Sequence, residues 1–567
     1  MSLSNYKSHI INIGNLLLGG NNPIRVQSMT STNTMDTKAT VEQSVRMIDT
    51  GCEMVRITAQ GVKEAEHLAV IKKELKIRGY EVPLIADIHF NPKAAEVAAR
   101  IVEKVRINPG NYIDRNRGKV DYSESEYNSE IEKIRKRIKP LIDVCKEYGT
   151  VIRIGSNHGS LSERILSRFG NTPLGMVESA MEFVRICEDL DFHNIVLSMK
   201  ASNVKIMVQA NRLLVQRMMD SGLNYPIHLG VTEAGDAEDG RIKSAAGIGT
   251  LLEDGIGDTI RVSLTEEPEF EIPVAKMIIE NAVGSQQSAV GSRHPDSYRE
   301  AVGNDTKLVR MGWQSPVVII NGNNFDINKF DENFLPDYLY ISGNTLSLPV
   351  LTPSGISFDY IDISFFEDQL KKKKNSVLVL ESNQNQSIHE ARNIISNIIK
   401  HNDRKPVILK RKYSGLSKEE FIVKAATDCS YLLVDGLIDG IWLEAENINS
   451  RFICETVFGI LQATGDRITK TEFIACPSCG RTLFNIQETL QQIKSKTVNL
   501  KGIKIAIMGC IVNGPGEMTD ADYGYVGAGP GKITLYRRNR PVKKNINESK
   551  AVEEMIRIIK ADGKWTN

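Results

Sequence analysis

The first 285 residues of this 567-residue chain alternate short apolar segments with amphipathic ones, and no other feature limits the possible folds as strongly. A short apolar run bounded by turn residues is typical of a buried strand, and an apolar repeat of period 3.6 indicates a helix. Eight strand–helix units occupy about the length that an eight-stranded parallel (β/α)8 barrel requires. An open doubly wound sheet is the alternative, and the lack of a Gly-x-Gly-x-x-Gly motif after the first strand disfavours it. We expect strands at residues 24–29, 52–58, 82–90, 104–109, 150–157, 194–202, 226–233 and 258–265, and helices at 62–78, 124–148, 176–189, 204–219 and 273–283.

The pattern changes after Val283, where a polar, turn-rich segment at 284–307 indicates a linker. We therefore divide the chain into a barrel at 1–285, an inserted α/β domain at 286–465 and a small C-terminal α/β domain at 466–567. The inserted domain shows no convergent set of polar groups, so we expect it to be architectural. Its strands are expected at 316–320, 359–364, 376–380 and 406–409, and its helices at 388–399, 418–426 and 451–463.

The composition is that of an ordinary globular protein, with 41% hydrophobic residues, 25% charged residues and a net charge of +1. A net charge this close to zero gives no electrostatic footprint for nucleic acid or for an anionic membrane. No apolar run approaches the ~18–20 residues that span a bilayer, and the N-terminus lacks the apolar core of a secretion signal. Eight cysteines in such a chain indicate a reducing compartment, so we expect a cytoplasmic protein.

Three cysteines near the C-terminus form the most specific chemical pattern. Cys476 and Cys479 make a Cys-x-x-Cys pair within the string ACPSCGR, and Cys510 lies in the string GCIVNGPGE, which ends at Glu517. A Cys-x-x-Cys pair closes a turn whose two sulfurs can bind one metal centre, and a third thiolate from a distant loop favours such a centre over a disulfide. The pattern predicts an iron–sulfur cluster with one unusual ligand or an open iron.

Two other interpretations of the cysteines stay open, namely a redox dithiol and a structural zinc ribbon. A zinc site needs a fourth ligand, but no histidine follows His401 and no cysteine follows Cys510, which leaves Cys454 or a carboxylate. An iron–sulfur cluster fits the pattern better. The other five cysteines lie in apolar stretches and are expected to be small buried side chains. They are Cys52, Cys145, Cys187, Cys429 and Cys454.

Polar residues follow the apolar part of nearly every expected barrel strand. Enzymes with this fold build their active sites at the carboxyl ends of the strands, where these residues would meet. Five of them are cations, which would repel one another unless an anion lay between them, and guanidinium groups match phosphate oxygens well. We therefore predict a diphosphate ligand. The five cations are Arg56, Arg106, Arg153, Lys200 and Arg261.

Acidic and neutral polar groups accompany these cations. Asp87, His89 and Glu233 are candidates for proton transfer or hydroxyl binding beside the anion. For Asp87 and His89 the alternative is structural hydrogen bonding of the barrel loops. The neutral candidates at the same strand ends are Asn108, Asn157 and Ser263.

The string GAGPGK at 527–532 resembles a phosphate-binding loop but is not interpreted as one. Ile533 occupies the position where such a loop requires Ser or Thr. A tight turn into a strand at 532–537 accounts for these glycines.

Several strings match the motifs of a known family. RVQSMT at 25–30, ADIHF at 86–90, RINPGN at 106–111 and HLGVTEAG at 228–235 resemble the barrel motifs of 4-hydroxy-3-methylbut-2-enyl diphosphate synthase. This family comprises the iron–sulfur reductases of the methylerythritol phosphate route to isoprenoids. The two cysteine strings resemble its cluster motifs.

The resemblance implies a 4Fe–4S cluster held by Cys476, Cys479 and Cys510, with Glu517 as a fourth, displaceable ligand. It implies that 2-C-methyl-D-erythritol 2,4-cyclodiphosphate is opened, reduced by two electrons and dehydroxylated to 4-hydroxy-3-methylbut-2-enyl diphosphate. Glu517 and Glu233 are the expected catalytic residues, and electrons would arrive singly from ferredoxin or flavodoxin. The implied substrate-binding residues are Arg56, Arg106, Arg153, Lys200 and Ser263.

The segment at 286–465 departs from the compact bacterial form of this family. In that form a head-to-tail dimer places the cluster of one chain over the barrel of the other. The chain resembles the larger form, also found in plants and chlamydiae, where the insert offers a way for one chain to close on itself. Two other classes stay as alternatives: a non-redox barrel enzyme with an appended zinc domain, and a non-catalytic iron–sulfur carrier. The cations of the barrel mouth disfavour the carrier.

Overall fold

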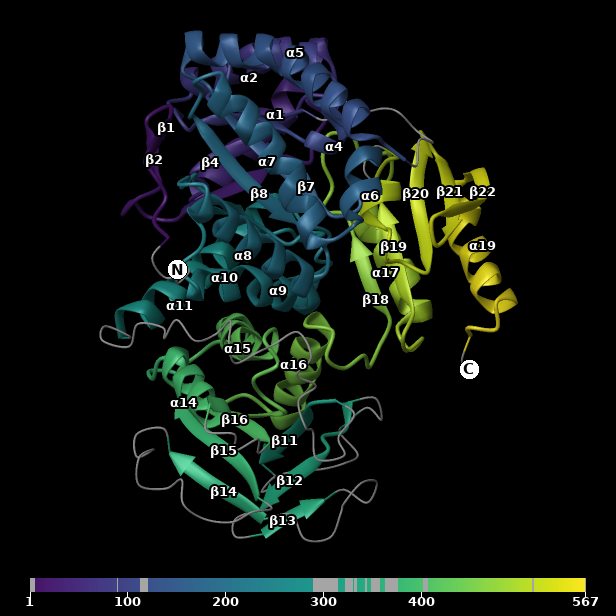
Figure 1. Ribbon diagram of the computed structural model, residues 1–567. Coiled ribbons are helices and arrows are strands. Elements are labelled where there is room, and N and C mark those ends of the chain that lie inside the picture. The colour runs from purple at the N-terminus through teal and green to yellow at the C-terminus, as the bar shows by residue number, and fades with distance from the viewer. Residues whose placement is uncertain are drawn as a thin grey trace. The chain divides into compact units, whose positions relative to one another are not determined.

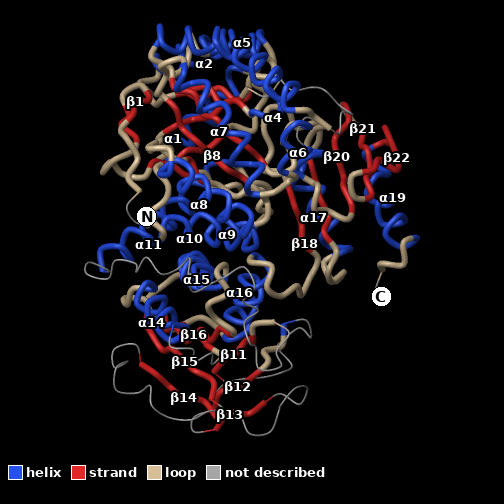
Figure 2. The backbone as a smooth tube through the Cα atoms, viewed as in Figure 1, coloured by secondary structure: helices blue, strands red, loops and turns tan. Residues whose placement is uncertain are grey.

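The computed structural model describes residues 6–88, 90–112, 121–288, 315–321, 330, 334–341, 344–347, 357–362, 376–400, 406–511 and 514–565. They belong to two compact units, whose secondary structure is shown in Figures 1 and 2. The larger unit contains residues 6–240, 256–276 and 471–567, and the smaller unit contains residues from 241–255 and 277–470. None of the helices described is both long enough and apolar enough to cross a membrane.

Eight parallel strands of the larger unit form a nearly closed barrel, which confirms the predicted (β/α)8 fold. Neighbouring strands follow the order of the chain, and the last strand pairs with the first. The sheet closes between β8 and β9 through the pairing of Leu197 with Ile227. Each strand lies within a predicted segment. The strands are β3 (Arg25–Met29), β4 (Met54–Thr58), β5 (Leu84–Asp87), β6 (Lys104–Ile107), β7 (Val151–Asn157), β8 (Ile195–Lys200), β9 (His228–Leu229) and β10 (Thr259–Ile260).

Helices cover the outside of this barrel (Figure 1). The longest of them begins where the sequence supplies a capping box, because the Ser123 side chain accepts from the amide of Glu126 and the Glu126 side chain accepts from that of Ser123. It ends at Gly149, whose φ of 70° is easily reached only by glycine. The helices are α1 (Thr37–Thr50), α2 (Val62–Ile77), α3 (Pro92–Ala98), α4 (Pro109–Tyr112), α5 (Glu124–Tyr148), α6 (Glu163–Phe169), α7 (Pro173–Asp189) and α8 (Val204–Asp220).

The last helix of the barrel runs further than expected. Helix α11 (Glu271–Ser288) continues five residues beyond Val283, so the prediction that a linker begins at residue 284 is wrong for 284–288. The polar Ser and Gln residues there are compatible with a helix end, where propensity costs are small. The rest of the expected linker, 289–307, lies outside the described residues.

The amino end of the barrel is closed by apolar side chains. A hairpin of β1 (Ile11–Ile13) and β2 (Leu16–Leu18) buries Ile11, Ile13 and Leu18 against the first residues of the barrel strands, among them Met54 and Val151. Burial of aliphatic side chains stabilises this end by about 25 cal/mol for each Å² removed from water. The opposite, carboxyl end is therefore the end at which polar side chains gather.

The C-terminal part of the larger unit is a five-stranded sheet in the order β18-β19-β20-β21-β22. Its first three strands are parallel and its last three antiparallel. The turn and strand predicted for 527–537 are confirmed by the β20–β21 hairpin. The elements are β18 (Glu472–Ala475), α17 (Ile486–Thr497), β19 (Lys504–Met508), α18 (Gly514–Glu517), β20 (Tyr523–Gly529), β21 (Lys532–Arg537), β22 (Arg540–Asn547) and α19 (Glu548–Ala561).

The smaller unit contains a second, mainly parallel sheet of seven strands in the order β13-β12-β11-β17-β16-β15-β14. The predicted strands at 316–320, 376–380 and 406–409 are found, and so is that at 359–364 over its described residues, since 363 and 364 lie outside them. The other three strands were not predicted. The strands are β11 (Val317–Asn321), β12 (Tyr338–Ile341), β13 (Asn344–Ser347), β14 (Ser357–Asp362), β15 (Ser376–Asn383), β16 (Val407–Tyr413) and β17 (Gly440–Ala445).

Three predicted helices of the smaller unit are also confirmed. They are α14 (Ile388–Lys400), α15 (Lys418–Leu433) and α16 (Ser450–Ala463). The same unit holds the end of α9 (Ala237–Ser244), a π-helical turn at Ala245–Gly249 and α10 (Thr250–Glu253). In this unit His389 Nε2 lies 2.9 Å from Glu253 Oε2, and both side chains are buried.

Candidate active site

A cavity opens at the carboxyl end of the barrel, and the empty space within it, open solvent included, is about 730 Å³. One wall comes from the barrel and the other from the C-terminal sheet, and both belong to the larger unit. Among the predicted site residues that the structure describes, every one except Asn108 lines it. These residues are Arg56, Asp87, Arg106, Arg153, Asn157, Lys200, Glu233, Arg261, Ser263, Cys476, Cys479, Cys510 and Glu517.

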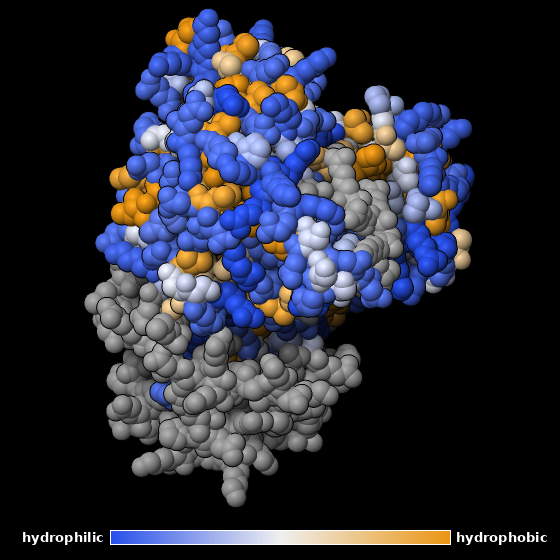
Figure 3. Space-filling view, turned by 45° about the horizontal axis from the view of Figure 1, so that its top comes forward, coloured by the Kyte–Doolittle hydropathy of each residue, from blue (hydrophilic) through white to orange (hydrophobic). Residues whose placement is uncertain are grey.

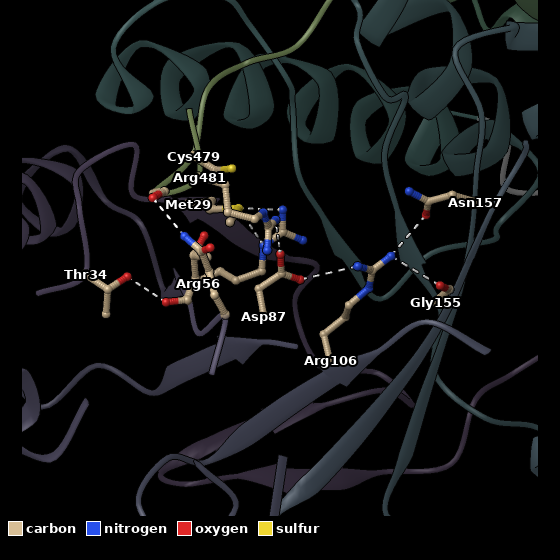
Figure 4. A network of polar contacts seen from close by, with 12 residues as sticks. Met29, Thr34, Arg56, Asp87, Arg106, Gly155, Asn157, Cys479 and Arg481 are labelled. Atoms are coloured by element: carbon tan, nitrogen blue, oxygen red, sulfur yellow. Dashed lines mark hydrogen bonds and ion pairs between the residues drawn. The ribbon is translucent and has the colours of Figure 1, made fainter. Parts of the chain in front are cut away.

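The strand geometry explains why the cations meet. In the parallel register, Arg56 on β4 pairs with Ile85 on β5, and Arg106 on β6 pairs with Arg153 on β7. Arg106 and Arg153 are therefore level on neighbouring strands, as is Asp87 on β5, whereas Arg56 is in register with Lys104, two residues before Arg106. The carboxyl ends of all these strands face one cavity. Figure 4 shows Arg56 and Arg106 on either side of Asp87.

Burial makes these cations electrostatically costly. Burial lowers the pKa of Lys200 well below its usual range, and the charges of Arg153, Arg56 and Arg261 lower it further. Burial likewise lowers the pKa of Arg153, with neighbouring arginines adding to the shift. The pKa of Arg56 falls to about 9 by burial, although Asp87 opposes the change. Such a group is stabilised by an anion that supplies the missing opposite charge.

The cations differ in how far the protein already neutralises them. Arg261 donates from Nε and Nη2 to the two carboxylate oxygens of Glu271, at 3.2 and 3.1 Å. Burial works against its charge, but Glu271 holds the pKa of Arg261 above the usual value. Arg153 is 1% exposed, and its Nε and Nη1 have no hydrogen-bond partner among the described residues. Arg153 is therefore better prepared than Arg261 to bind an anion.

Asp87 lies between cations from both walls (Figure 4). Nη1 of Arg106 is 3.5 Å from its Oδ1, and Nη2 of Arg481 donates to its Oδ2 at 3.0 Å. Arg481 belongs to the cysteine loop after β18, so this ion pair joins the barrel to the C-terminal sheet. Burial works against the charge of Arg481, but Cys479 and Asp87 keep its pKa above the usual value.

The three cysteines reach the cavity because of the order of the strands. Cys476 follows β18 directly and Cys510 follows β19 by two residues, and these neighbouring strands are parallel. Their carboxyl ends therefore present both cysteines at one edge of the sheet, beside Cys479. Burial raises the pKa of the Cys476 thiol well above its usual value, and the nearby Cys479, Glu233 and Glu517 raise it further.

The donor set fits a cluster of several metals. Among the described residues, no three His, Cys, Asp or Glu side chains are close enough together to hold a single metal ion. A cubic iron–sulfur cluster places its irons at separate corners, so its ligands need not converge on one point. Three thiols and the Glu517 carboxylate lining one cavity are suitable donors for such a group.

The cysteine-bearing sheet contacts the barrel of its own chain at several points. Asn157 Nδ2 donates to Glu517 Oε1 at 2.8 Å. Ala234, which follows Glu233, pairs with Ala475, which precedes Cys476. Because these contacts lie within the larger unit, barrel residues and cysteine-loop residues of one chain form the cavity together.

Two glycines allow the closest of these approaches. A Cβ atom at Gly159, after β7, would lie 2.1 Å from the carbonyl oxygen of Gly516. A Cβ atom at Gly516 would lie 2.5 Å from the carbonyl oxygen of Gly159. The two loops thus meet backbone against backbone, which places Glu517 directly beside Asn157.

Glu233 is held in a strained backbone position at the cavity. Its φ is 48°, in the left-handed region that non-glycine residues seldom adopt, and the residue is 4% exposed. Its Oε2 has no hydrogen-bond partner among the described residues. Burial raises the pKa of Glu233 well above its usual value, and the neighbouring Glu517 adds to this shift.

Of the predicted residues within the described part of the chain, Asn108 alone does not line the cavity. Asn108 is buried, and its Oδ1 accepts from the amide of Gly110, which caps the turn that starts α4. His89 lies outside the described residues. Arg481 and Met29 also line the cavity and were not predicted from the sequence. The position of Arg481 two residues after Cys479 is the signal that could have identified it.

Comparisons with known proteins agree with this geometry. A family model described as the GcpE TIM-barrel domain matches residues 8–276, and one described as the GcpE protein C-terminal domain matches 472–561. A relative from Phocaeicola vulgatus is 47% identical over 100% of both chains. Relatives from Bacteroides fragilis and Parabacteroides distasonis are 47% and 46% identical, over 100% of this chain and 97% and 100% of theirs. All three are named 4-hydroxy-3-methylbut-2-en-1-yl diphosphate synthase (flavodoxin).

Proposed function

The chain belongs to the GcpE family of 4-hydroxy-3-methylbut-2-en-1-yl diphosphate synthases, and we propose that it catalyses the reaction of that family. The substrate is 2-C-methyl-D-erythritol 2,4-cyclodiphosphate. Two electrons and two protons open its ring and remove one hydroxyl as water, which gives 4-hydroxy-3-methylbut-2-enyl diphosphate, an isoprenoid precursor. The observation that carries the proposal is the single cavity shared by the five cations, the three cysteines and Glu517.

We assign the cofactor as a 4Fe–4S cluster held by Cys476, Cys479, Cys510 and Glu517. When bound, the cluster supplies electrons one at a time to the reduction. Asn157 orients the Glu517 carboxylate from the barrel side, through its 2.8 Å hydrogen bond. Arg481 places a permanent positive charge beside the thiolates, which favours their ionised form.

The barrel residues bind and orient the diphosphate. Arg153 and Lys200 are buried cations that form no ion pair with any described residue, so they gain most from the phosphate oxygens. Arg56, Arg106, Arg261 and Ser263 complete the wall around the anion. His89 remains a proposed substrate-binding residue from its place at the end of a predicted strand, whereas Asn108, predicted on the same ground, caps the turn that starts α4. Glu233 lines the wall nearest Glu517 and is the proposed group that positions substrate or donates a proton.

The electron donor is proposed to be flavodoxin, the donor in the names of the relatives, with ferredoxin as the other candidate. We place the enzyme in the cytoplasm. We also propose three functional domains, 1–285 for the substrate, 286–465 as an architectural insert and 466–567 for the cluster. Because the barrel and the cysteine-bearing sheet meet within the larger unit, one chain is proposed to form a complete site.

Anaerobic turnover tests the proposal. The purified protein, reconstituted with iron and sulfide, is supplied with the cyclodiphosphate and reduced methyl viologen, and the linear diphosphate is measured by mass spectrometry. We expect about four irons per chain and product formation that requires both reductant and substrate. A colourless protein that retains one zinc and forms no product would favour the non-redox alternative.

A further inference from the structure

The C-terminal part of the chain carries a charge that the rest of the chain does not. The whole chain is nearly neutral, with 71 Lys and Arg against 70 Asp and Glu. Residues 471–567 contain 15 Lys and Arg against 9 Asp and Glu, so this segment is cationic and the remainder is anionic. Segregation of charge on this scale creates a field that attracts anionic molecules toward one part of the surface.

Seven of these fifteen cations lie within residues 532–550, at the outer edge of the C-terminal sheet. Strand β22 is the last strand of the sheet, and all its residues except Ile546 are exposed. In Figure 3 the outer side of the C-terminal sheet, at the right of the view, is mostly hydrophilic. One acid, Glu548, occurs within the same residues. The cations, here called the cationic edge, are Lys532, Arg537, Arg538, Arg540, Lys543, Lys544 and Lys550.

Only part of the cationic edge is neutralised by the protein. Arg537 pairs with Asp562 at 2.6 Å, and Lys543 pairs with Glu554. Arg538, Arg540, Lys544 and Lys550 form no ion pair within the described part of the chain, and all four are exposed. These side chains are available to a partner without the breaking of an internal contact.

One end of this edge lies beside the loop of Cys510. The hairpin that joins β20 to β21 packs there, since a Cβ atom at Gly527 would lie 2.5 Å from the carbonyl oxygen of Gly509. Ile511, directly after Cys510, is 54% exposed and is one of several large apolar side chains at the surface. An apolar contact point is therefore found where the cysteine loop reaches the surface, with Lys532 at the nearby start of β21.

Charged residues on an edge strand also prevent sheets from joining edge to edge, and this is the plain structural explanation. It accounts for charge on β22 itself, but it does not account for exposed cations on the adjoining turn and at the start of α19. Nor does it account for the exposed Ile511 beside a cysteine. Apolar contact surrounded by complementary charge is typical of a transient protein interface.

We infer that the cationic edge and Ile511 form the docking surface for an acidic flavodoxin. The inference rests on the proposed function, which requires a protein donor to approach the cysteines twice in each turnover. Each docking oxidises one flavin hydroquinone to its semiquinone and delivers one electron. The cations guide the anionic carrier by long-range attraction, and Ile511 provides the short-range contact near Cys510.

The test compares two charge-reversal variants that carry the same change in net charge. The first is Arg538→Glu/Arg540→Glu/Lys544→Glu on the cationic edge. The control is Lys63→Glu/Lys136→Glu/Arg137→Glu, at exposed positions on α2 and α5. Turnover is measured with a purified flavodoxin of verified negative charge, and separately with methyl viologen. The readout is the ratio of the flavodoxin rate to the viologen rate. A loss of fold or cofactor lowers both rates and leaves this ratio unchanged.

In the edge variant we expect kcat/KM for flavodoxin to fall ~10-fold or more at low salt, relative to the viologen rate. The control should change less than about 2-fold. Flavodoxin turnover by the wild type should fall with ionic strength while viologen turnover does not. Equal ratios in all three proteins, or wild-type flavodoxin turnover that is insensitive to salt, would overturn the docking surface. Absence of turnover with either reductant would instead overturn the proposed function.

Discussion

The guanidinium of Arg481 donates to the carboxylate of Asp87 across 3.0 Å, and this ion pair joins the cysteine loop to the barrel. Both side chains are buried, with exposed fractions of 8% and 3%. Asp87 also lies 3.5 Å from Arg106. The Asp87 carboxylate therefore contacts a cation of the barrel and a cation of the cysteine loop, and it loses the second contact when the C-terminal sheet leaves the barrel.

We predict that Arg481→Gln loosens the contact between the cysteine loop and the barrel. Removal of one partner of a buried ion pair costs on the order of 3–5 kcal/mol, and this cost falls on the docked arrangement. Hydrogen exchange should accelerate in the barrel loops at 156–160 and 232–236. Arg481→Lys should have a smaller effect, and Arg78→Gln, at an exposed position, should have none. Unchanged exchange in Arg481→Gln would show that the ion pair does not hold the two parts together.

Serine at Cys476, Cys479 or Cys510 should abolish retention of the cluster. Thiolates hold the irons directly, so a site that loses one of three cannot keep the group. Iron and sulfide are counted after anaerobic reconstitution. The control is Cys187→Ser, a fully buried position away from the cavity, which should retain iron and cost about 1–3 kcal/mol in stability. A Cys479→Ser protein with a full complement of iron would refute the assignment.

Lys200→Met should weaken substrate binding and yet stabilise the substrate-free protein. Loss of a charge-assisted contact to phosphate costs roughly 1.5–3 kcal/mol, which corresponds to a rise in KM of about 10- to 150-fold. Without substrate the buried ammonium is repelled by Arg153 and Arg56, so its removal should raise the melting temperature. Lys63→Met, at an exposed position, should change neither quantity. A lower melting temperature with unchanged KM would contradict the assignment of Lys200.

Lys200 also makes the stability of the folded protein depend on pH, in a direction that its pKa shift determines. Folding lowers the pKa of Lys200, so the folded protein binds fewer protons at this group than the unfolded protein does. The free-energy cost of holding charged Lys200 in the folded protein is therefore present below the folded pKa. This cost disappears as pH rises toward the unfolded pKa of about 10.4. As pH rises in this window, the melting temperature of the wild type should increase relative to that of Lys200→Met. A constant difference would mean that Lys200 is not destabilised by burial.

Gly159→Ala should separate the two walls of the cavity. The new Cβ atom would meet the carbonyl oxygen of Gly516 at 2.1 Å, and the backbone has a φ of 79°. Gly79→Ala is the matched control, because its φ is 85° and no atom lies within 4 Å. Both variants should pay the strain of a left-handed alanine, about 1–2 kcal/mol. Only Gly159→Ala should lose turnover, by about 100-fold, since small misplacements of reacting groups are costly.

The sequence predicted the barrel because its strands are short, apolar and regularly spaced, and the strand period places Arg56 and Arg106 at the same end. The sequence also predicted that the cysteines bind a metal centre, because their spacing is specific to such sites. The residue pairs that dock the C-terminal sheet could not be predicted, since the Arg481–Asp87 and Asn157–Glu517 contacts join residues 394 and 360 positions apart. No local pattern encodes such pairs.

Other differences have local causes. Asn108 shares the strand alternation of Arg106, but the strand ends at Ile107 and the Asn108 side chain caps the following turn instead. Three strands of the smaller unit escaped prediction. Of these, β17 carries the alternating sequence Gly-Ile-Trp-Leu-Glu-Ala in a mainly parallel sheet, where strands usually appear as continuous apolar runs. The division into three domains stays a prediction, as do the roles of the individual site residues.

The central claim is that the barrel cations and the cysteines of one chain form one reductive site, and mixing two inactive variants tests it most directly. Lys200→Met retains the cysteines, and Cys510→Ser retains the cations. The two variants, carrying different tags, are coexpressed and reconstituted, and turnover with methyl viologen is compared with that of each variant alone. A site built within one chain predicts no recovery of turnover. Recovered turnover would show that the cysteines of one chain serve the barrel of another, and would contradict the claim.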